Sequence, residues 1–102
     1  MAETEHPDQA STPMTLRLDE SKLRTTCSNA FRTNGTVEEL LLDFGINSPN
    51  PSDPDEVLMH IQTRVILSYF SAKRLALALG QAIQHHEQQF GELELDPSKR
   101  RN

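Results

Sequence analysis

The single cysteine is the first residue whose type could carry chemistry. Cys27 could serve as a nucleophile if a base lay beside it, since such a thiol must be activated. Its neighbours Thr26 and Ser28 form no recognisable catalytic motif, and an extended strand is expected there. We therefore predict a small packed thiol. One cysteine allows no intramolecular disulfide, which fits a reducing compartment.

The histidines are the second candidates, as metal ligands. His85 and His86 are adjacent, followed by Glu87, in a segment with helical periodicity. Adjacent helical residues point about 100° apart, whereas a helical ligand pair is spaced i, i+4. His86 lies on the apolar stripe of the predicted helix and His85 lies off it, while His60 belongs to a predicted strand. We expect no metal site and no other cofactor.

Carboxylates occur as Glu38-Glu39 and as the group Asp53, Asp55 and Glu56. Acid–base catalysis needs two groups held across a pocket with pKa values pushed apart. These residues lie in or near stretches expected to be solvated, so an acidic surface is predicted. Four glycines do not make a glycine-rich phosphate loop of the usual kind. We expect no catalytic residues and no enzymatic activity.

Composition limits the size of any core. The chain has 102 residues, enough for one domain, and 35% of them are hydrophobic, below the roughly 45–50% that is typical of globular chains. The polar residues concentrate at positions 1–20, 47–56 and 96–102. A small core gives little stability, and self-association commonly compensates for it.

Charge and hydropathy disfavour two classes of partner. The net charge is −5 and the basic residues are scattered, whereas a nucleic-acid binder usually carries a basic patch. No apolar run approaches the ~20 residues of a membrane span. The acidic, polar start lacks the layout of a signal peptide. A cytoplasmic location is expected, with no membrane contact.

The first half of the chain predicts a polar tail followed by strands. Residues 1–13 are expected to be disordered. Period-two alternation predicts short strands over 14–18, through Met14, Leu16 and Leu18, and over 23–33. The Asn34-Gly35 pair predicts a hairpin with a type I′ turn.

The second half predicts two more strands and a helix. A strand over 36–46 places Leu40, Leu42, Phe44 and Ile46 on one face. The segment 47–56 contains three prolines and predicts a loop insertion. A strand over 57–67 follows, with five residues expected on one face: Val57, Met59, Ile61, Val65 and Leu67.

A long amphipathic helix is predicted from Ser68 to Phe90, with Ser68 as its N-cap and Gly91 ending it in a left-handed conformation. Its apolar stripe repeats at spacings of three and four and comprises Ala72, Leu75, Ala76, Leu79, Ala82, Ile83, His86 and Phe90. The predicted fold is α+β: an antiparallel sheet of about three to four strands followed by one long C-terminal helix packed on it. The predicted domain spans 14–95, with a disordered tail over 96–102.

Apolar residues outside the expected core predict a surface for self-association or for a partner. Such patches are normally small on soluble monomers. The predicted surface comprises Val37, Leu41, Leu58, Ile66, Leu77, Ala78 and Gly80.

Two segments resemble a known family: SNAFRTNGTVEELLLDFG (28–45) and RVILSYFSAKRLALALGQAIQHHEQQFGEL (64–93). The matching residues are Asn29, Asp43-Phe44-Gly45, Ala72-Lys73-Arg74-Leu75 and Glu87-x-x-Phe90-Gly91. The chain is similar to small bacterial and archaeal proteins of domain of unknown function 3467. It departs from them at Phe70, where proline is expected, at His86, where tyrosine is expected, and in a longer 47–56 segment. The resemblance implies a fold of strands followed by a helix, and it supplies no function.

The leading functional prediction is a non-enzymatic protein–protein interaction or structural module that forms a homo-oligomer, with a dimer expected. One alternative is a chaperone-like or adaptor protein that binds extended peptides at a sheet edge or apolar groove. Another is a nucleic-acid-binding regulator that uses Arg24, Arg64 and Arg74, which the net charge disfavours.

Overall fold

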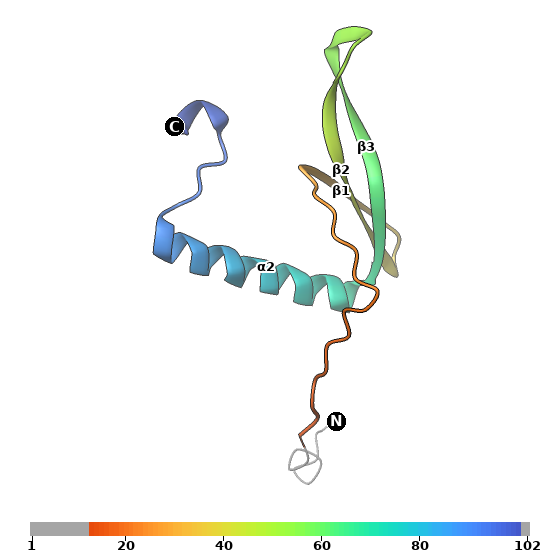
Figure 1. The fold of residues 1–102 in the computed structure, drawn as a ribbon, viewed down its shortest axis with the longest axis vertical. Helices are drawn as coiled ribbons and strands as arrows, with labels where there is room; N and C mark the ends of the chain where they lie inside the picture. The colour runs from red at the N-terminus through yellow and green to blue at the C-terminus, as the bar shows by residue number, and fades with distance from the viewer. Residues whose placement is uncertain (1–12, 101–102) are drawn as a thin grey trace.

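The computed structural model describes residues 13–100 and shows three strands followed by one long helix (Figure 1). The sheet is antiparallel in the order β1-β2-β3. The predicted α+β class and the order of strands before helix are confirmed, with three strands. The elements are β1 (Ala30–Gly35), β2 (Glu39–Asn50), β3 (Asp53–Ser68), α2 (Tyr69–Phe90) and the short 3-10 helix η1 (Pro97–Lys99).

The β1–β2 hairpin turns three residues later than predicted, at Val37-Glu38 and not at Asn34-Gly35. The connection is Thr36–Glu38, where the Thr36 hydroxyl accepts from the amides of Glu38 and Glu39 at 3.2 and 3.1 Å. The Thr36 amide donates to the Glu39 carbonyl at 2.9 Å. Gly35 has no positive φ, so a type I′ turn at Asn34-Gly35 is wrong. A threonine side chain that bonds the backbone makes this turn instead.

The prediction of a loop over 47–56 is also wrong, because both strands continue through most of it. Pro49 pairs with Val57 in the β2–β3 ladder, and Pro54 lies in β3. A strand tolerates proline where one of its edges is free. The β1–β2 pairing stops at Gly45, so the far halves of β2 and β3 form a two-stranded ribbon with two free edges.

A β-bulge in β3 divides its side chains between the two faces of the sheet. Phe44 pairs with Thr63 and Gly45 pairs with Ile61, so Gln62 is an extra residue. Because side chains alternate with period two, one extra residue sends the next ones to the opposite face. The predicted single face of this strand is therefore wrong: Val65 and Leu67 lie on one face, and Val57, Met59 and Ile61 on the other.

The register defines two faces, named here by adjacent residues of β2. The apolar side chains of the Phe44 face are Phe31, Leu40, Leu42, Phe44, Val65 and Leu67, and Thr33 and Thr63 lie on the same face. The Asp43 face includes Arg32, Leu41, Asp43, Arg64 and Ile66, with Ala30 and Asn34 of β1 on the same side.

The predicted strand over 14–18 is absent, and residues 13–28 form no strand. Met14, Leu16 and Leu18 are exposed. The predicted packed thiol at Cys27 is wrong as well, since Cys27 is exposed in this coil. Ordered pairing begins at Asn29, whose amide donates to the Gly45 carbonyl at 3.2 Å and whose side-chain oxygen accepts from the Asn47 amide at 2.8 Å.

The helix boundaries are confirmed at both ends. The Ser68 hydroxyl accepts from the Ser71 amide at 3.2 Å, as an N-cap does. Gly91 has φ +94°, and its amide donates to the Glu87 carbonyl at 2.8 Å. Part of the predicted C-terminal tail is ordered, since Pro97–Lys99 forms η1. The tail predicted over 1–13 lies, except for Pro13, outside the described residues.

Unlike the predicted packing, α2 does not cover the sheet. Figure 1 shows the helix leaving the end of β3 and running away from the strands. No helix residue is buried. Among residues 13–100, Ala30 is the only buried apolar side chain, and Asp43 and Gly45 are the other buried residues. The described part of one chain therefore has almost no hydrophobic core of its own.

Candidate interaction surface

The Phe44 face is a layer of apolar cross-strand pairs. Phe31 lies opposite Phe44, Leu42 opposite Val65, and Leu40 opposite Leu67. Pairs of this kind stabilise a sheet when a second layer covers them. Here Phe31 is 72% exposed and Val65 is also exposed, while the other four side chains are only half-buried. The face is shaped like one side of a core that lacks its second layer.

Tyr69 closes one end of this face. Its hydroxyl donates to the Thr36 carbonyl at 2.9 Å. It also lies where a side chain on Gly35 would stand, so an added Cβ there would meet the hydroxyl at 2.5 Å. Gly35 is thus required by the approach of Tyr69, not by a turn.

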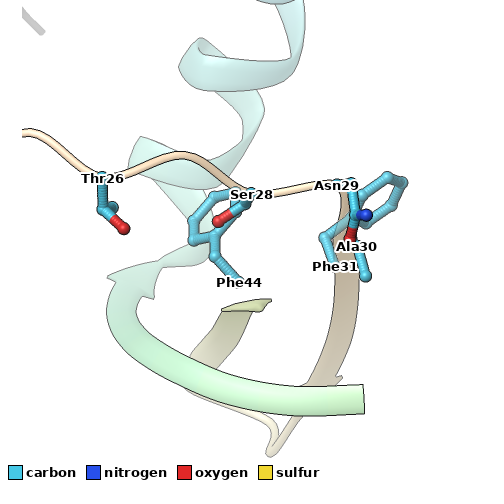
Figure 2. A pocket seen from close by; sticks show the side chains of 6 residues that line it. All are labelled: Thr26, Ser28, Asn29, Ala30, Phe31 and Phe44. Carbon is cyan, nitrogen blue, oxygen red and sulfur yellow. The ribbon is translucent and has the colours of Figure 1, made fainter. Parts of the chain in front are cut away.

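A pocket of about 520 Å³ opens at the other end of the face, where the coil before β1 passes Phe44 (Figure 2). In Figure 2, the Phe44 ring extends from β2 toward the coil at Ser28. The lining residues are Thr26, Ser28, Asn29, Ala30, Phe31 and Phe44. None of them carries an acid, a base or an activated nucleophile, so the pocket suits an apolar side chain better than a reaction.

The Asp43 face carries one carboxylate held by two arginines. Arg64 donates from Nε to Asp43 Oδ1 at 2.7 Å and from Nη2 to Oδ2 at 3.0 Å. Arg32 donates from Nε to Oδ2 at 2.9 Å. The three residues pair across β1, β2 and β3. This arginine clamp (Arg32, Asp43, Arg64) ties all three strands together.

The clamp determines the charge state of Asp43. The hydrogen bonds from Arg64 and then from Arg32 hold the pKa of Asp43 far below its usual range. The same contact raises the pKa of Arg64. A carboxylate that stays ionised and accepts three charge-assisted hydrogen bonds suits structure better than proton transfer. Sequence reasoning missed this cluster, for which the signal was one aspartate inside the apolar run Leu40–Phe44.

The structure separates the sheet residues of the predicted partner surface. Leu41 and Ile66 are opposite each other on the Asp43 face. Leu58 pairs with Ser48. Its side chain lies on the opposite face of the ribbon, because the bulge at Gln62 shifts the alternation of side chains by one residue. Val37 lies in the Thr36–Glu38 connection and is almost fully exposed. One continuous patch is not formed, although each residue is exposed or half-buried.

The helix residues of that surface are exposed. Leu77 is 61% exposed and lines a shallow pocket of about 340 Å³ with Tyr69, Phe70, Lys73 and Arg74. Ala78 is exposed, and Gly80 has open space where a Cβ would stand. The main stripe is exposed as well, with Leu79 at 54% and Ile83 at 48%. Both apolar surfaces of α2 are thus without a partner within residues 13–100.

The three described histidines, His60, His85 and His86, contact different residues. The rings of His86 and Phe90 are 4.8 Å apart and tilted. His85 Nε2 is 3.3 Å from Gln89 Nε2, and His60 Nε2 is 3.1 Å from Ser48 Oγ. No group of three or more His, Cys, Asp or Glu side chains suited to a metal occurs between residues 13 and 100. Over the same span no helix has the length and apolar character needed to cross a membrane.

Fold and surface together define a small α+β protein whose apolar faces are left uncovered within the described chain. The family "Protein of unknown function (DUF3467)" matches residues 1–95, and the chain belongs to that family. Neither a curated protein nor a solved structure matches it.

The residues that carry the family resemblance hold the fold together. Asn29 bonds β1 to β2, and Asp43 accepts the arginine clamp. Gly45 lies so close to β3 that an added Cβ would collide with the His60 carbonyl. The Glu87 carboxylate accepts from the Leu93 amide at 2.9 Å, just beyond the helix end. These roles are structural.

Proposed function

We propose that this protein is a non-enzymatic interaction module that self-associates, with a homodimer as its working form in the cytoplasm. One observation carries the proposal: among residues 13–100 a single apolar side chain, Ala30, is buried. Burial of apolar surface is the main favourable term in folding. A chain that buries so little alone gains stability when a second surface covers it.

A second copy suits this need better than an occasional partner. A surface required for stability must be covered whenever the chain is folded, and another copy is present whenever the chain is made. The accessible surface is 9616 Å², against about 5800 Å² for a compact 11.5 kDa monomer. Part of this excess comes from the exposed coil over residues 13–28. The exposed apolar side chains of the sheet and of α2 are the part that a second copy would cover.

Size-exclusion chromatography with light scattering at micromolar concentration tests the proposal. The expected mass is that of a dimer or a larger closed assembly, with a Tm that rises with protein concentration because dissociation accompanies unfolding. A folded, monodisperse monomer whose Tm is independent of concentration would contradict self-association.

A chaperone-like role is the second candidate, and the free edge of β3 favours it. Among the strands of residues 13–100, β3 pairs only with β2, so its other edge presents amide and carbonyl groups to which an extended peptide can add. Fluorescence anisotropy with several labelled unfolded polypeptides is the test. Saturable binding supports this role, and its absence for all of them removes it.

Nucleic-acid binding has less support. Arg64 is engaged by Asp43, and the net charge is −5. A gel shift at low salt that shows no complex would close this alternative.

A further inference from the structure

We infer that α2 of one copy lies across the Phe44 face of a second copy, and that the second helix covers the first sheet in the same way. This inference rests on the proposed self-association and names the two surfaces that meet. Within residues 13–100, each chain carries an apolar helix with no buried residue and an apolar sheet face that is only partly covered. A twofold pair then satisfies both with the same contact made twice.

The junction between β3 and α2 keeps the helix off its own sheet. Ser68 is both the last residue of β3 and the N-cap of α2, and Tyr69 is already helical. Folding a helix back onto its strand takes a connection, commonly of about 2–6 residues. The Tyr69 hydroxyl, bonded to Thr36, further fixes the first turn. The helix therefore points away from the strands, as Figure 1 shows.

The main stripe of α2 is built to meet a flat apolar surface. Leu75, Leu79, Ile83 and Phe90 are all exposed, and they follow one side of a 22-residue helix about 33 Å long. Leu75, Leu79 and Ile83 carry no polar group and cannot hydrogen-bond or pair with a charge. The surface that covers them should therefore have no charged group that contact with them would bury.

The Phe44 face meets this condition and the Asp43 face does not. At the centre of the Asp43 face, the side chains of Arg32 and Arg64 are 57% and 48% exposed. Covering them with leucine and isoleucine would remove water from two guanidinium groups without a new partner. The Phe44 face carries six apolar side chains, of which Phe31 and Val65 are exposed. Its polar members from the same cross-strand pairs, Thr33 and Thr63, are uncharged, so no ionised group would lose water there.

Inter-chain disulfide trapping tests the inference on the full chain. The background is Cys27→Ser, so each chain carries a single introduced cysteine. One tagged chain carries Leu79→Cys, and a differently tagged chain, co-expressed with it, carries Val65→Cys. Because each chain has one cysteine, a disulfide between the two tags must join helix to sheet in different copies. Leu75→Cys and Ile83→Cys repeat the test one turn to either side, which allows for the position of the helix along the sheet.

Two matched controls use neighbouring residues on the opposite sides. Ile66→Cys replaces Val65→Cys and points to the Asp43 face. Leu77→Cys replaces Leu79→Cys and lies about 200° away around the helix. We expect at least one stripe variant to cross-link with Val65→Cys at least tenfold faster than either control pair.

Each other result overturns the inference in a different way. Faster trapping with Ile66→Cys places the helix on the Asp43 face. Faster trapping of Leu79→Cys with itself indicates that two helices pair with each other. Faster trapping of Leu77→Cys with Val65→Cys indicates that the helix meets the sheet through its other apolar surface, around Leu77. A light-scattering dimer in which no helix variant reacts leaves self-association intact without α2 in the interface. A monomer by light scattering removes self-association as well.

Discussion

Arg64 holds Asp43 through both carboxylate oxygens, with Nε 2.7 Å from Oδ1 and Nη2 3.0 Å from Oδ2. Two parallel bonds between a guanidinium and a carboxylate fix geometry as well as charge. Arg32 adds one more bond, from the other neighbouring strand. The register of β2 against both of its neighbours thus depends on one side chain.

Stability should fall in acid through Asp43. Its pKa in the folded protein lies far below its unfolded value, which is about 3.9. The stabilisation is therefore fully present above about pH 4 and is lost as the pH falls toward the folded-state pKa. Urea midpoints from pH 7 to pH 2, at one protein concentration, should show this decrease.

The matched variants separate this effect from general acid unfolding. Asp43→Asn should lower the midpoint at pH 7 and flatten its dependence on acid pH. Arg64→Met should lower the midpoint at pH 7 more than Arg32→Met does, since Arg64 makes two of the three bonds. An unchanged acid dependence in Asp43→Asn would show that other groups cause it.

Gly45→Ala should destabilise the sheet. The added Cβ would collide with the His60 carbonyl, which is backbone and cannot move aside. Forcing extra volume into a packed site costs about 1–3 kcal/mol of unfolding free energy. Gly80→Ala is the control: it has open space within α2 and should stabilise by about 0.5–1 kcal/mol. Equal effects of the two variants in urea unfolding would contradict the close approach at Gly45.

Gly91→Ala should weaken the end of α2. Gly91 has φ +94° and ψ +167°, a region that is essentially restricted to glycine, where a side chain costs about 1–3 kcal/mol. Thermal unfolding by circular dichroism at fixed concentration measures the loss. A Tm equal to that of the unaltered chain would show that the chain leaves the helix differently.

Tyr69→Phe should remove one bond between α2 and the β1–β2 connection. A hydrogen bond of this kind contributes about 0.5–1.5 kcal/mol, and the ring itself is kept. Hydrogen exchange of the amides of Thr36 and Glu39 gives a local measurement. Faster exchange at both is expected, and unchanged exchange would contradict the role of Tyr69 in fixing the first helical turn.

The helix could be predicted from sequence because its signals are local. Ser68 caps it and Gly91 ends it, and each acts within one turn. The alternation of Leu40, Leu42 and Phe44 likewise predicted their common face. The same alternation at Met14, Leu16 and Leu18 predicted a strand that does not form. A strand also needs a neighbouring strand to pair with, and a local sequence pattern does not show whether one is present.

The faces of β3 could not be predicted, because they depend on pairing. The extra residue Gln62 is defined only by its relation to β2. The arginine clamp depends on the same register, because Arg32 and Arg64 reach Asp43 only when the three strands are correctly paired. It could not be recognised from the sequence pattern alone. Prolines at positions 49 and 54 predicted a loop, although a free strand edge accommodates them.

The direct continuation of β3 into α2 has a consequence for biosynthesis. The ribosome makes the sheet before the helix, because β1, β2 and β3 precede α2 in the chain. In an α+β domain whose helix packs on the sheet, the helix covers one face of the strands once it has been made. Here α2 points away from the strands, so its synthesis leaves the Phe44 face as exposed as before. A newly made chain therefore keeps this apolar surface exposed until a second surface covers it.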